Sequence, residues 1–209
     1  MSDRDSLARI VEPRRPPIDP RRTAFFVCDM QNDFVHDDGA FPRRSGSNAA
    51  SVLIPPFKRV LASCRESKIP IFYTRVVNRV DGVGQSLRMS REIGALMEGS
   101  WGAAVIDELK PLPAEFDIIK WRYSAFFATP LEMMLRGLNI QTIVLGGVAT
   151  NGGVESNVRD AEYRDFNAVV LSDLCSARTK ELHEASLETI RSSFGRVMTS
   201  AEFINILSK

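Results

Sequence analysis

Short apolar runs alternate with segments of helical periodicity along most of this chain. Residues 23–28 form a continuous apolar run, as expected of a parallel strand that helices cover on both faces. Further runs predict strands at residues 69–74, 117–119, 142–145, 167–171 and 197–198. An alternation of strands and helices predicts a doubly wound α/β fold with a parallel sheet and right-handed crossovers.

The composition excludes several classes of protein. The 209 residues include 27 Lys and Arg against 26 Asp and Glu, so no basic surface for nucleic acid is indicated. The cysteines Cys28, Cys64 and Cys175 are too widely spaced for a metal-ligand pair or a disulfide framework. Without a membrane-length apolar run or a signal-peptide core, we expect a cytoplasmic protein with no membrane partner. We also expect no cofactor and no metal, because only two distant histidines are present.

Residues 1–22 differ in composition from the rest of the chain. They are rich in Arg, and Pro13, Pro16, Pro17 and Pro20 disfavour a regular helix or a central strand. We interpret them as an N-terminal arm, for which a solvated tail is favoured over a contact with a partner subunit. Residues 23–209 are then expected to form one domain.

The segment at residues 146–156 predicts a strand, a tight turn and a helix. Small residues follow the apolar run at 142–145, and Val154, Val158 and Ala161 then recur at helical spacing. A helix that begins here directs backbone N–H groups at the space above the turn, where they can hold an anion or an oxyanion. An ordinary connection between a strand and a helix needs small residues as well, so both interpretations stay open.

Asp29 is the first candidate for chemistry. It directly follows the run at residues 23–28 and therefore lies at the carboxyl edge of the predicted sheet, where ligands bind in open α/β folds. A carboxylate there can act as an acid or a base, although an Asp that only caps the next turn is an equal alternative. Residues 76–103 predict a long loop over this edge, in which Trp101 either covers a pocket or pins the loop.

Three motifs carry a resemblance to a known family. The motifs are Asp29 to Phe34, Lys120 to Phe126, and Gly147 to Asn151 with the following Val154 to Ala161. With these motifs, the chain resembles the isochorismatase-like hydrolase superfamily over residues 23 to about 200. The resemblance implies a three-layer fold with a six-stranded parallel sheet, order 3-2-1-4-5-6, and helices on both faces. It also implies a site at the carboxyl edge and a cis peptide between Val148 and Ala149.

Most members of that superfamily are cysteine hydrolases with an Asp, Lys and Cys triad. Asp29 and Lys120 match the first two members, and Gly153 stands at the position of the nucleophile. By sequence position, none of the three cysteines can replace the missing thiol. Amide hydrolysis through a thioester needs an activated thiolate, so the ordinary amidase mechanism is not expected.

Isochorismatases proper are similar to this chain in having a small residue at that position. The resemblance implies that they hydrolyse a vinyl ether, with the Asp as general acid towards the enol carbon and water capturing the resulting cation. Asp29 as the acid and Lys120 as the neighbouring cation fit these roles. Because an adjacent Lys lowers the pKa of an Asp, burial would have to restore the proton affinity of Asp29.

Two alternatives stay open beside vinyl-ether hydrolysis of a small anionic substrate. Asp29 could activate water for attack on a small amide or other carboxylate, with Gly153 leaving room for that water. The chain could also be a non-catalytic relative, although two charged pocket residues are costly to keep unused. As partners we expect a small-molecule substrate and further copies of the chain, in a dimer or tetramer.

Besides Asp29, Lys120 and Gly153, we expect a set of substrate-binding residues around the same edge. They are Gln31, Phe34, Arg75, Trp101, Tyr123, Ala149, Thr150, Asn151 and Gly152. Arg75 either binds a substrate carboxylate in a bidentate way or forms a structural ion pair. In a 3-2-1-4-5-6 sheet the strand of Lys120 is two places from that of Asp29, roughly 9–10 Å away, so only a long side chain or an extended strand end would join them.

Overall fold

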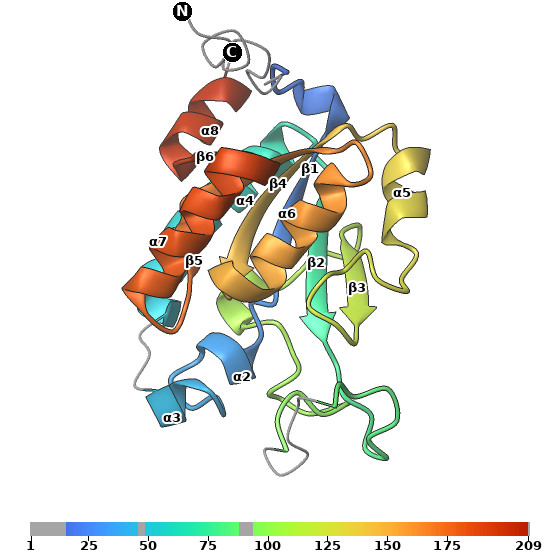
Figure 1. Ribbon diagram of the computed structural model, residues 1–209, viewed down its shortest axis with the longest axis vertical. Coiled ribbons are helices and arrows are strands. Elements are labelled where there is room, and N and C mark those ends of the chain that lie inside the picture. Colours follow the sequence, from blue (N-terminus) through green and yellow to red (C-terminus); the bar gives the residue numbers. More distant parts are fainter. Residues whose placement is uncertain (1–15, 46–48, 88–93, 209) are drawn as a thin grey trace, which may run out of the picture.

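A single parallel sheet organises the molecule. The computed structural model describes residues 16–45, 49–87 and 94–208. Its six strands have the order β3-β2-β1-β4-β5-β6 (Figure 1), which confirms the predicted topology. The strands are β1 Thr23–Cys28, β2 Ile71–Val76, β3 Phe116–Lys120, β4 Thr142–Val148, β5 Asn167–Ser176 and β6 Arg196–Met198.

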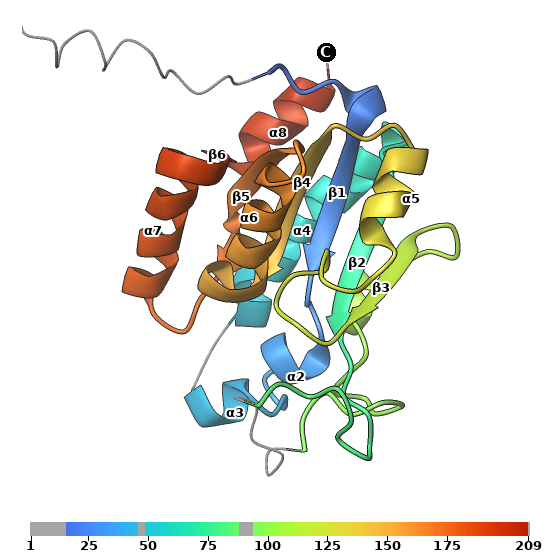
Figure 2. The same cartoon turned by 45° about the vertical axis from the view of Figure 1, so that its right-hand side comes forward.

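Helices cover both faces of the sheet, as predicted. On one face lie α4 (Ala49–Glu66) and α8 (Ser200–Leu207), and on the other lie α5 (Leu131–Gly137), α6 (Glu155–Glu162) and α7 (Lys180–Thr189), as Figures 1 and 2 show. Because both faces are covered, every residue of the central strands β1 and β4 is buried.

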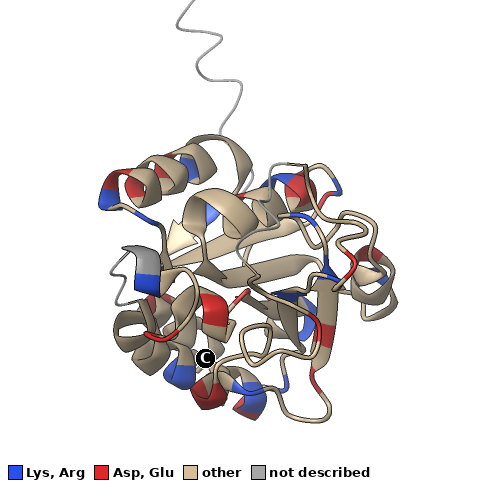
Figure 3. Cartoon of the chain, turned by 90° about the horizontal axis from the view of Figure 1, so that it is seen from below, with Lys and Arg blue, Asp and Glu red and all other residues tan. Residues whose placement is uncertain are grey.

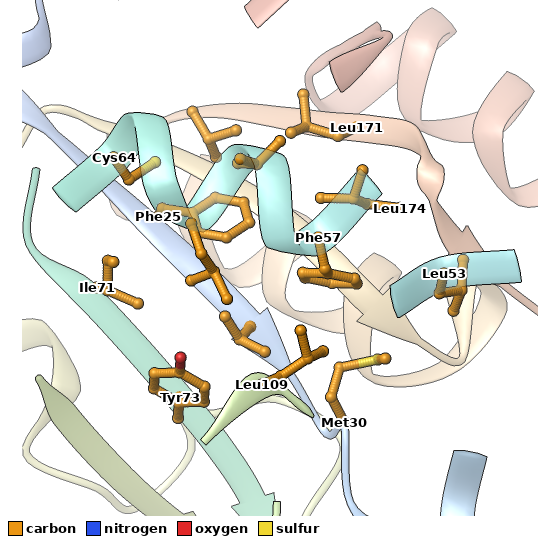
Figure 4. Close-up of a cluster of buried hydrophobic side chains, with 14 of the residues drawn as sticks. Phe25, Met30, Leu53, Phe57, Cys64, Ile71, Tyr73, Leu109, Leu171 and Leu174 are labelled. Atoms are coloured by element: carbon orange, nitrogen blue, oxygen red, sulfur yellow. The ribbon is translucent and has the colours of Figure 1, made fainter. Parts of the chain in front are cut away.

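Two hydrophobic cores, one on each face, hold these layers together. Successive side chains of a strand point to opposite faces, so Phe25 and Val27 pack under α4 while Phe26 and Cys28 pack under α5 and α6. Phe57 of α4 contacts Phe25 with a ring separation of 6.1 Å (Figure 4). Full burial of such a side chain stabilises the fold by roughly 1.5–3 kcal/mol.

Shorter elements connect the layers. They are the 3₁₀ helices η1 Pro20–Arg22 and η3 Asp107–Leu109, the short helices α2 Asn32–Val35 and α3 Pro42–Ser45, and the π-helical turns η4 Thr150–Val154 and η5 Ile190–Phe194. The predicted arm lies outside the described residues up to position 15, and its last residues form η1, which leads directly into β1.

Strand β5 extends furthest beyond its predicted range. The sequence predicts this strand over residues 167–171, but β5 continues to Ser176. Its register against β4 shifts between Leu145 and Gly147, and pairing then resumes with Cys175 and Ser176. The strand continues because of this second stretch of pairing, and the Asp173 carboxylate within it accepts hydrogen bonds from the Ser200 amide (2.7 Å) and hydroxyl (2.6 Å) at the start of α8.

Candidate active site

Asp29 marks the point where β1 ends at the carboxyl edge of the sheet. Its φ of 54° lies in the left-handed region, which Asp tolerates better than most residues and which is often found at functional sites. The carboxylate is only 5% exposed. It accepts hydrogen bonds from Thr74 Oγ1 at 2.8 Å and from Lys120 Nζ at 2.7 Å.

Lys120 reaches Asp29 from the end of β3, two strands away. Its side chain is fully buried, and its ammonium group also donates to the carbonyl oxygens of Tyr123 (2.9 Å) and Arg122 (3.2 Å). The long side chain therefore spans the width of β2. All three donors of the ammonium group are satisfied, as a buried charge requires.

Burial and pairing act on the Asp29 carboxyl in opposite directions. Removal from water raises its pKa, while Lys120 and the Thr74 hydroxyl lower it, and burial prevails so that the pKa lies above its usual value of 3.8. The pKa of Asp29 is therefore raised although Lys120 lies beside it. A carboxyl with a raised pKa is suited to proton transfer near neutral pH.

The connection from β4 to α6 brings backbone close to this carboxylate. A Cβ added to Gly147, whose φ is 134°, would lie 1.9 Å from the Cys28 carbonyl oxygen, so only glycine fits beside β1. The predicted cis peptide between Val148 and Ala149 is present. Beyond it, a Cβ at Gly153 would lie 2.9 Å from Asp29 Oδ2. The missing side chain therefore leaves the carboxylate directly accessible from this side.

Asn157, which is not among the predicted site residues, holds the Gly153 turn in place. The side chain is completely buried. It donates from Nδ2 to the Gly153 carbonyl (2.8 Å), and its Oδ1 accepts from the Ala125 amide (2.7 Å). Asn157 thus links the turn after β4 to the loop after β3. A polar residue among the apolar helical positions of residues 154–161 was the available signal.

A cavity of about 440 Å³ opens beside Asp29 and Gly153. Most of its wall is apolar and is formed by Phe34, Phe41, Val76, Leu96, Trp121, Tyr123, Val148 and Ala149. The polar, charged and glycine residues of the wall are Asp29, Asn78, Ser86, Arg122, Gly152, Gly153 and Arg178. An apolar pocket with a few convergent polar groups is typical of a small-molecule site.

The structure brings some of the predicted site residues together at this cavity. Asp29, Phe34, Tyr123, Ala149, Gly152 and Gly153 line it, and Lys120 contacts Asp29 from below the wall. Gln31, Arg75, Trp101, Thr150 and Asn151 do not line it. For these five residues, direct contact with a substrate stays a prediction.

Side-chain contacts explain what several of these five residues do. Gln31 is buried and clamps the end of β2 to the long loop, since its amide nitrogen donates to Val76 O (2.8 Å) and Ala103 O (2.9 Å). Arg75 forms an ion pair with Asp117 of β3 and also donates to Ala103 O. These contacts favour the structural alternative for Arg75.

Trp101 and Thr150 have partners outside the cavity. Trp101 is half-exposed and packs edge-on against His36, with a ring separation of 4.9 Å. The Thr150 hydroxyl lies 2.8 Å from His183 Nδ1 of α7. Trp101 therefore pins the long loop, and Thr150 ties the turn after β4 to a helix.

Nine wall residues were not identified from the sequence. They are Phe41, Val76, Asn78, Ser86, Leu96, Trp121, Arg122, Val148 and Arg178. Most belong to loops, which carry no periodic signal, and tertiary contacts bring them to the wall. For example, the Leu96 amide donates to Asp33 Oδ2 at 2.6 Å. Trp121 and Arg122 lie in the Lys120–Phe126 motif, and proximity to a strand end was the available indication for Arg178.

None of the cysteines lines the cavity. Burial raises the pKa of Cys64 and of Cys175 to about 12, and it raises the pKa of Cys28 well above its usual value. These thiols are therefore protonated at neutral pH and are poor nucleophiles. Within the described ranges, no His, Cys, Asp and Glu side chains cluster as a metal site would require, and no helix is long and apolar enough to span a membrane.

The parallel sheet carries a paired carboxylate and ammonium group beside a cavity at its carboxyl edge. This arrangement defines an α/β enzyme that acts on a small molecule. The family model "Isochorismatase domain" matches residues 23–202. The chain belongs to the isochorismatase family and is a hydrolase.

Known proteins of this family are similar over nearly the whole chain. The ureidoacrylate amidohydrolase RutB of Methylobacterium radiotolerans is 32% identical, and the alignment covers 98% of this chain and 89% of that protein. The cysteine hydrolase of Pseudomonas syringae pv. phaseolicola has a TM-score of 0.84 at 28% identity, covering 95% and 99% of the two chains. The N-carbamoylsarcosine amidase of Thermoplasma acidophilum has a TM-score of 0.69 at 28% identity, covering 86% and 96%.

Proposed function

We propose that this hydrolase cleaves a small anionic vinyl ether by proton transfer from Asp29, without a covalent enzyme intermediate. The observation that carries the proposal is the absence of a side chain at Gly153, where a Cβ would lie 2.9 Å from Asp29 Oδ2. A substrate atom can occupy that space and meet the carboxyl directly. The raised pKa of Asp29 supports its role as the acid.

The proposed reaction follows from these positions. Asp29 gives its proton to the terminal enol carbon, and the ether carbon becomes an oxocarbenium ion. Water adds to that ion and returns a proton to Asp29, after which the hemiketal releases an alcohol and a keto acid. Lys120, 2.7 Å from Asp29 Oδ2, stabilises the carboxylate while it is ionised.

Amide hydrolysis is the second candidate function, because the similar RutB proteins carry the name ureidoacrylate amidohydrolase. In that case a water molecule would occupy the space beside Gly153. Asp29 would remove its proton as a general base, and the hydroxide would attack the substrate carbonyl. The same two residues serve both candidates, but Asp29 must start protonated in one and ionised in the other.

Product assays on the purified protein separate the two candidates. We expect pyruvate release from isochorismate, and we expect no ammonia release from ureidoacrylate or N-carbamoylsarcosine. The opposite pattern would replace vinyl-ether hydrolysis with amide hydrolysis. No turnover of any of the three compounds would discard them as substrates.

The pH dependence of kcat gives an independent prediction. If Asp29 is a general acid, kcat falls as the pH rises through its pKa, whereas a general base requires kcat to rise over the same range. Since the pKa of Asp29 is raised above 3.8, we expect this limb of the profile above pH 3.8. A kcat profile that increases with pH would contradict the acid role.

Replacing Gly153 with Ala is expected to lower kcat by about tenfold or more. The new methyl group would lie 2.9 Å from Asp29 Oδ2, so the carboxyl must move away from Lys120, and small displacements of reacting groups are costly. Gly137→Ala is the matched control, because an added Cβ there has no neighbour within 4 Å. Equal kcat in both variants would show that the space beside Asp29 is not used.

A further inference from the structure

The charges that line the cavity are unbalanced. Among the described residues of the wall, Asp29 is the acidic one, and Lys120 already compensates its charge. Arg122 and Arg178 also line the cavity, so the wall carries an excess of positive charge. In a view towards the carboxyl edge of the sheet, acidic and basic residues are interspersed over the rest of the described chain (Figure 3).

The two arginines differ in how far their guanidinium groups are engaged. Arg122 Nη1 donates to the carbonyl oxygens of Gly84 (2.8 Å) and Trp121 (2.7 Å), which ties this side chain to its own loop and to the loop after β2. Within the described ranges, Arg178 has neither an ion-pair partner nor a hydrogen bond from its guanidinium group. Arg178 can therefore offer its planar set of donors to a ligand.

The position of Arg178 sets where such a ligand group would lie. It follows β5 and directly precedes Thr179, whose hydroxyl caps α7 by accepting from the Leu182 amide. In the sheet, β5 is two places from β1 on the side opposite β3. Arg178 thus approaches the cavity from the side opposite Lys120. The apolar wall between the two sides suits an unsaturated or ring-shaped body.

From this arrangement we infer that Arg178 is a specificity-determining residue that binds a carboxylate of the substrate on the β5 side of the cavity. The inference deepens the proposed function, because it rests on Asp29 meeting the reactive end of the same molecule. The substrate class is then a small carboxylate whose acid group and scissile bond lie at opposite ends of an apolar body. Arg75, already paired with Asp117, is not needed for this contact.

A binding experiment tests the inference separately from catalysis. Benzoate and its neutral counterpart benzamide serve as probes, and calorimetry gives their Kd values for the unmodified protein, Arg178→Gln and Lys180→Gln. Lys180 is an exposed cation in the first turn of α7 that does not line the cavity. Lys180→Gln removes one positive charge two residues from Arg178 and leaves the cavity wall unchanged.

We expect benzoate to bind the unmodified protein more tightly than benzamide, and Arg178→Gln to weaken benzoate by about tenfold with little effect on benzamide. Lys180→Gln should change either Kd by less than about twofold, because exposed charges are screened. Equal losses in both variants, or no preference for benzoate, would overturn the inference. The product assays test the vinyl-ether mechanism, and the Kd values test the Arg178 contact. A negative result in one experiment therefore does not change the result of the other.

Discussion

Replacing Asp29 with Asn is expected to lower kcat by about 10²- to 10⁴-fold, the usual contribution of a general acid or base. Asn keeps the shape of the side chain and can still accept a hydrogen bond from Lys120, but it cannot give up or take a proton at this position. The pH limb assigned to Asp29 should disappear from the residual activity. Initial-rate assays across pH on the purified variant check both expectations.

The control for this variant is Asp107→Asn. Asp107 is an exposed carboxylate paired with Lys110 at 2.9 Å, and it does not line the cavity. Its loss should leave kcat and KM unchanged. If Asp29→Asn retains kcat within about threefold of the unmodified protein, Asp29 is not the acid or base of this reaction.

Replacing Lys120 with Met is expected to lower the free energy of unfolding by about 3–5 kcal/mol at pH 8, because it leaves a buried carboxylate without its cation. Lys120 is fully buried and makes its closest contact, 2.7 Å, with Asp29. Two backbone carbonyl groups, those of Arg122 and Tyr123, also lose a donor. Denaturant unfolding at fixed pH measures the loss.

The loss should depend on pH in a defined direction. Lys120 lowers the pKa of Asp29, so without it the folded-state pKa rises further above the unfolded value of about 3.8–3.9. The folded state then binds a proton more tightly than the unfolded state, and stability falls as the pH rises from the unfolded pKa to the folded pKa. We therefore expect Lys120→Met to be less destabilising at pH 4 than at pH 8.

The double variant Asp29→Asn with Lys120→Met separates stability from catalysis. Asp29→Asn alone leaves the ammonium group of Lys120 without its carboxylate and is also expected to be destabilising. With neither charge buried, the double variant should recover part of the lost stability, so that the two single losses are not additive. Its kcat should stay as low as that of Asp29→Asn. Additive losses of stability would show that the pair is not coupled.

The order of strands and helices followed from local features of the chain. The apolar run of β1, flanked by Asp29, predicts a buried parallel strand with a carboxylate at its end, and the structure has both. The helices covering the sheet follow from periodicity in the same way. These features depend on neighbouring residues, and a strand buried on both faces must be apolar whatever packs against it.

The composition of the cavity wall depended on contacts between distant segments. Arg75 and Arg178 both lie near the carboxyl end of a strand, and the sequence favoured Arg75 as the substrate-binding arginine. Asp117 of the adjacent strand β3, however, holds the Arg75 guanidinium. β5 extends to Ser176 because it pairs with β4, and this extension places Arg178 at the cavity. Asp117 and β4, which decide these two placements, both lie far from the arginines in the sequence.

The sequence by itself determined the layered α/β fold, the position of Asp29 at the carboxyl edge and the lack of a thiol at Gly153. Only the tertiary structure decided that Lys120, 91 residues from Asp29 in the chain, meets it at 2.7 Å, and that Asn157 holds Gly153 beside the same carboxylate. Periodicity reports which face of an element is buried. The partner of a buried polar group is set by strand order, register and side-chain length together.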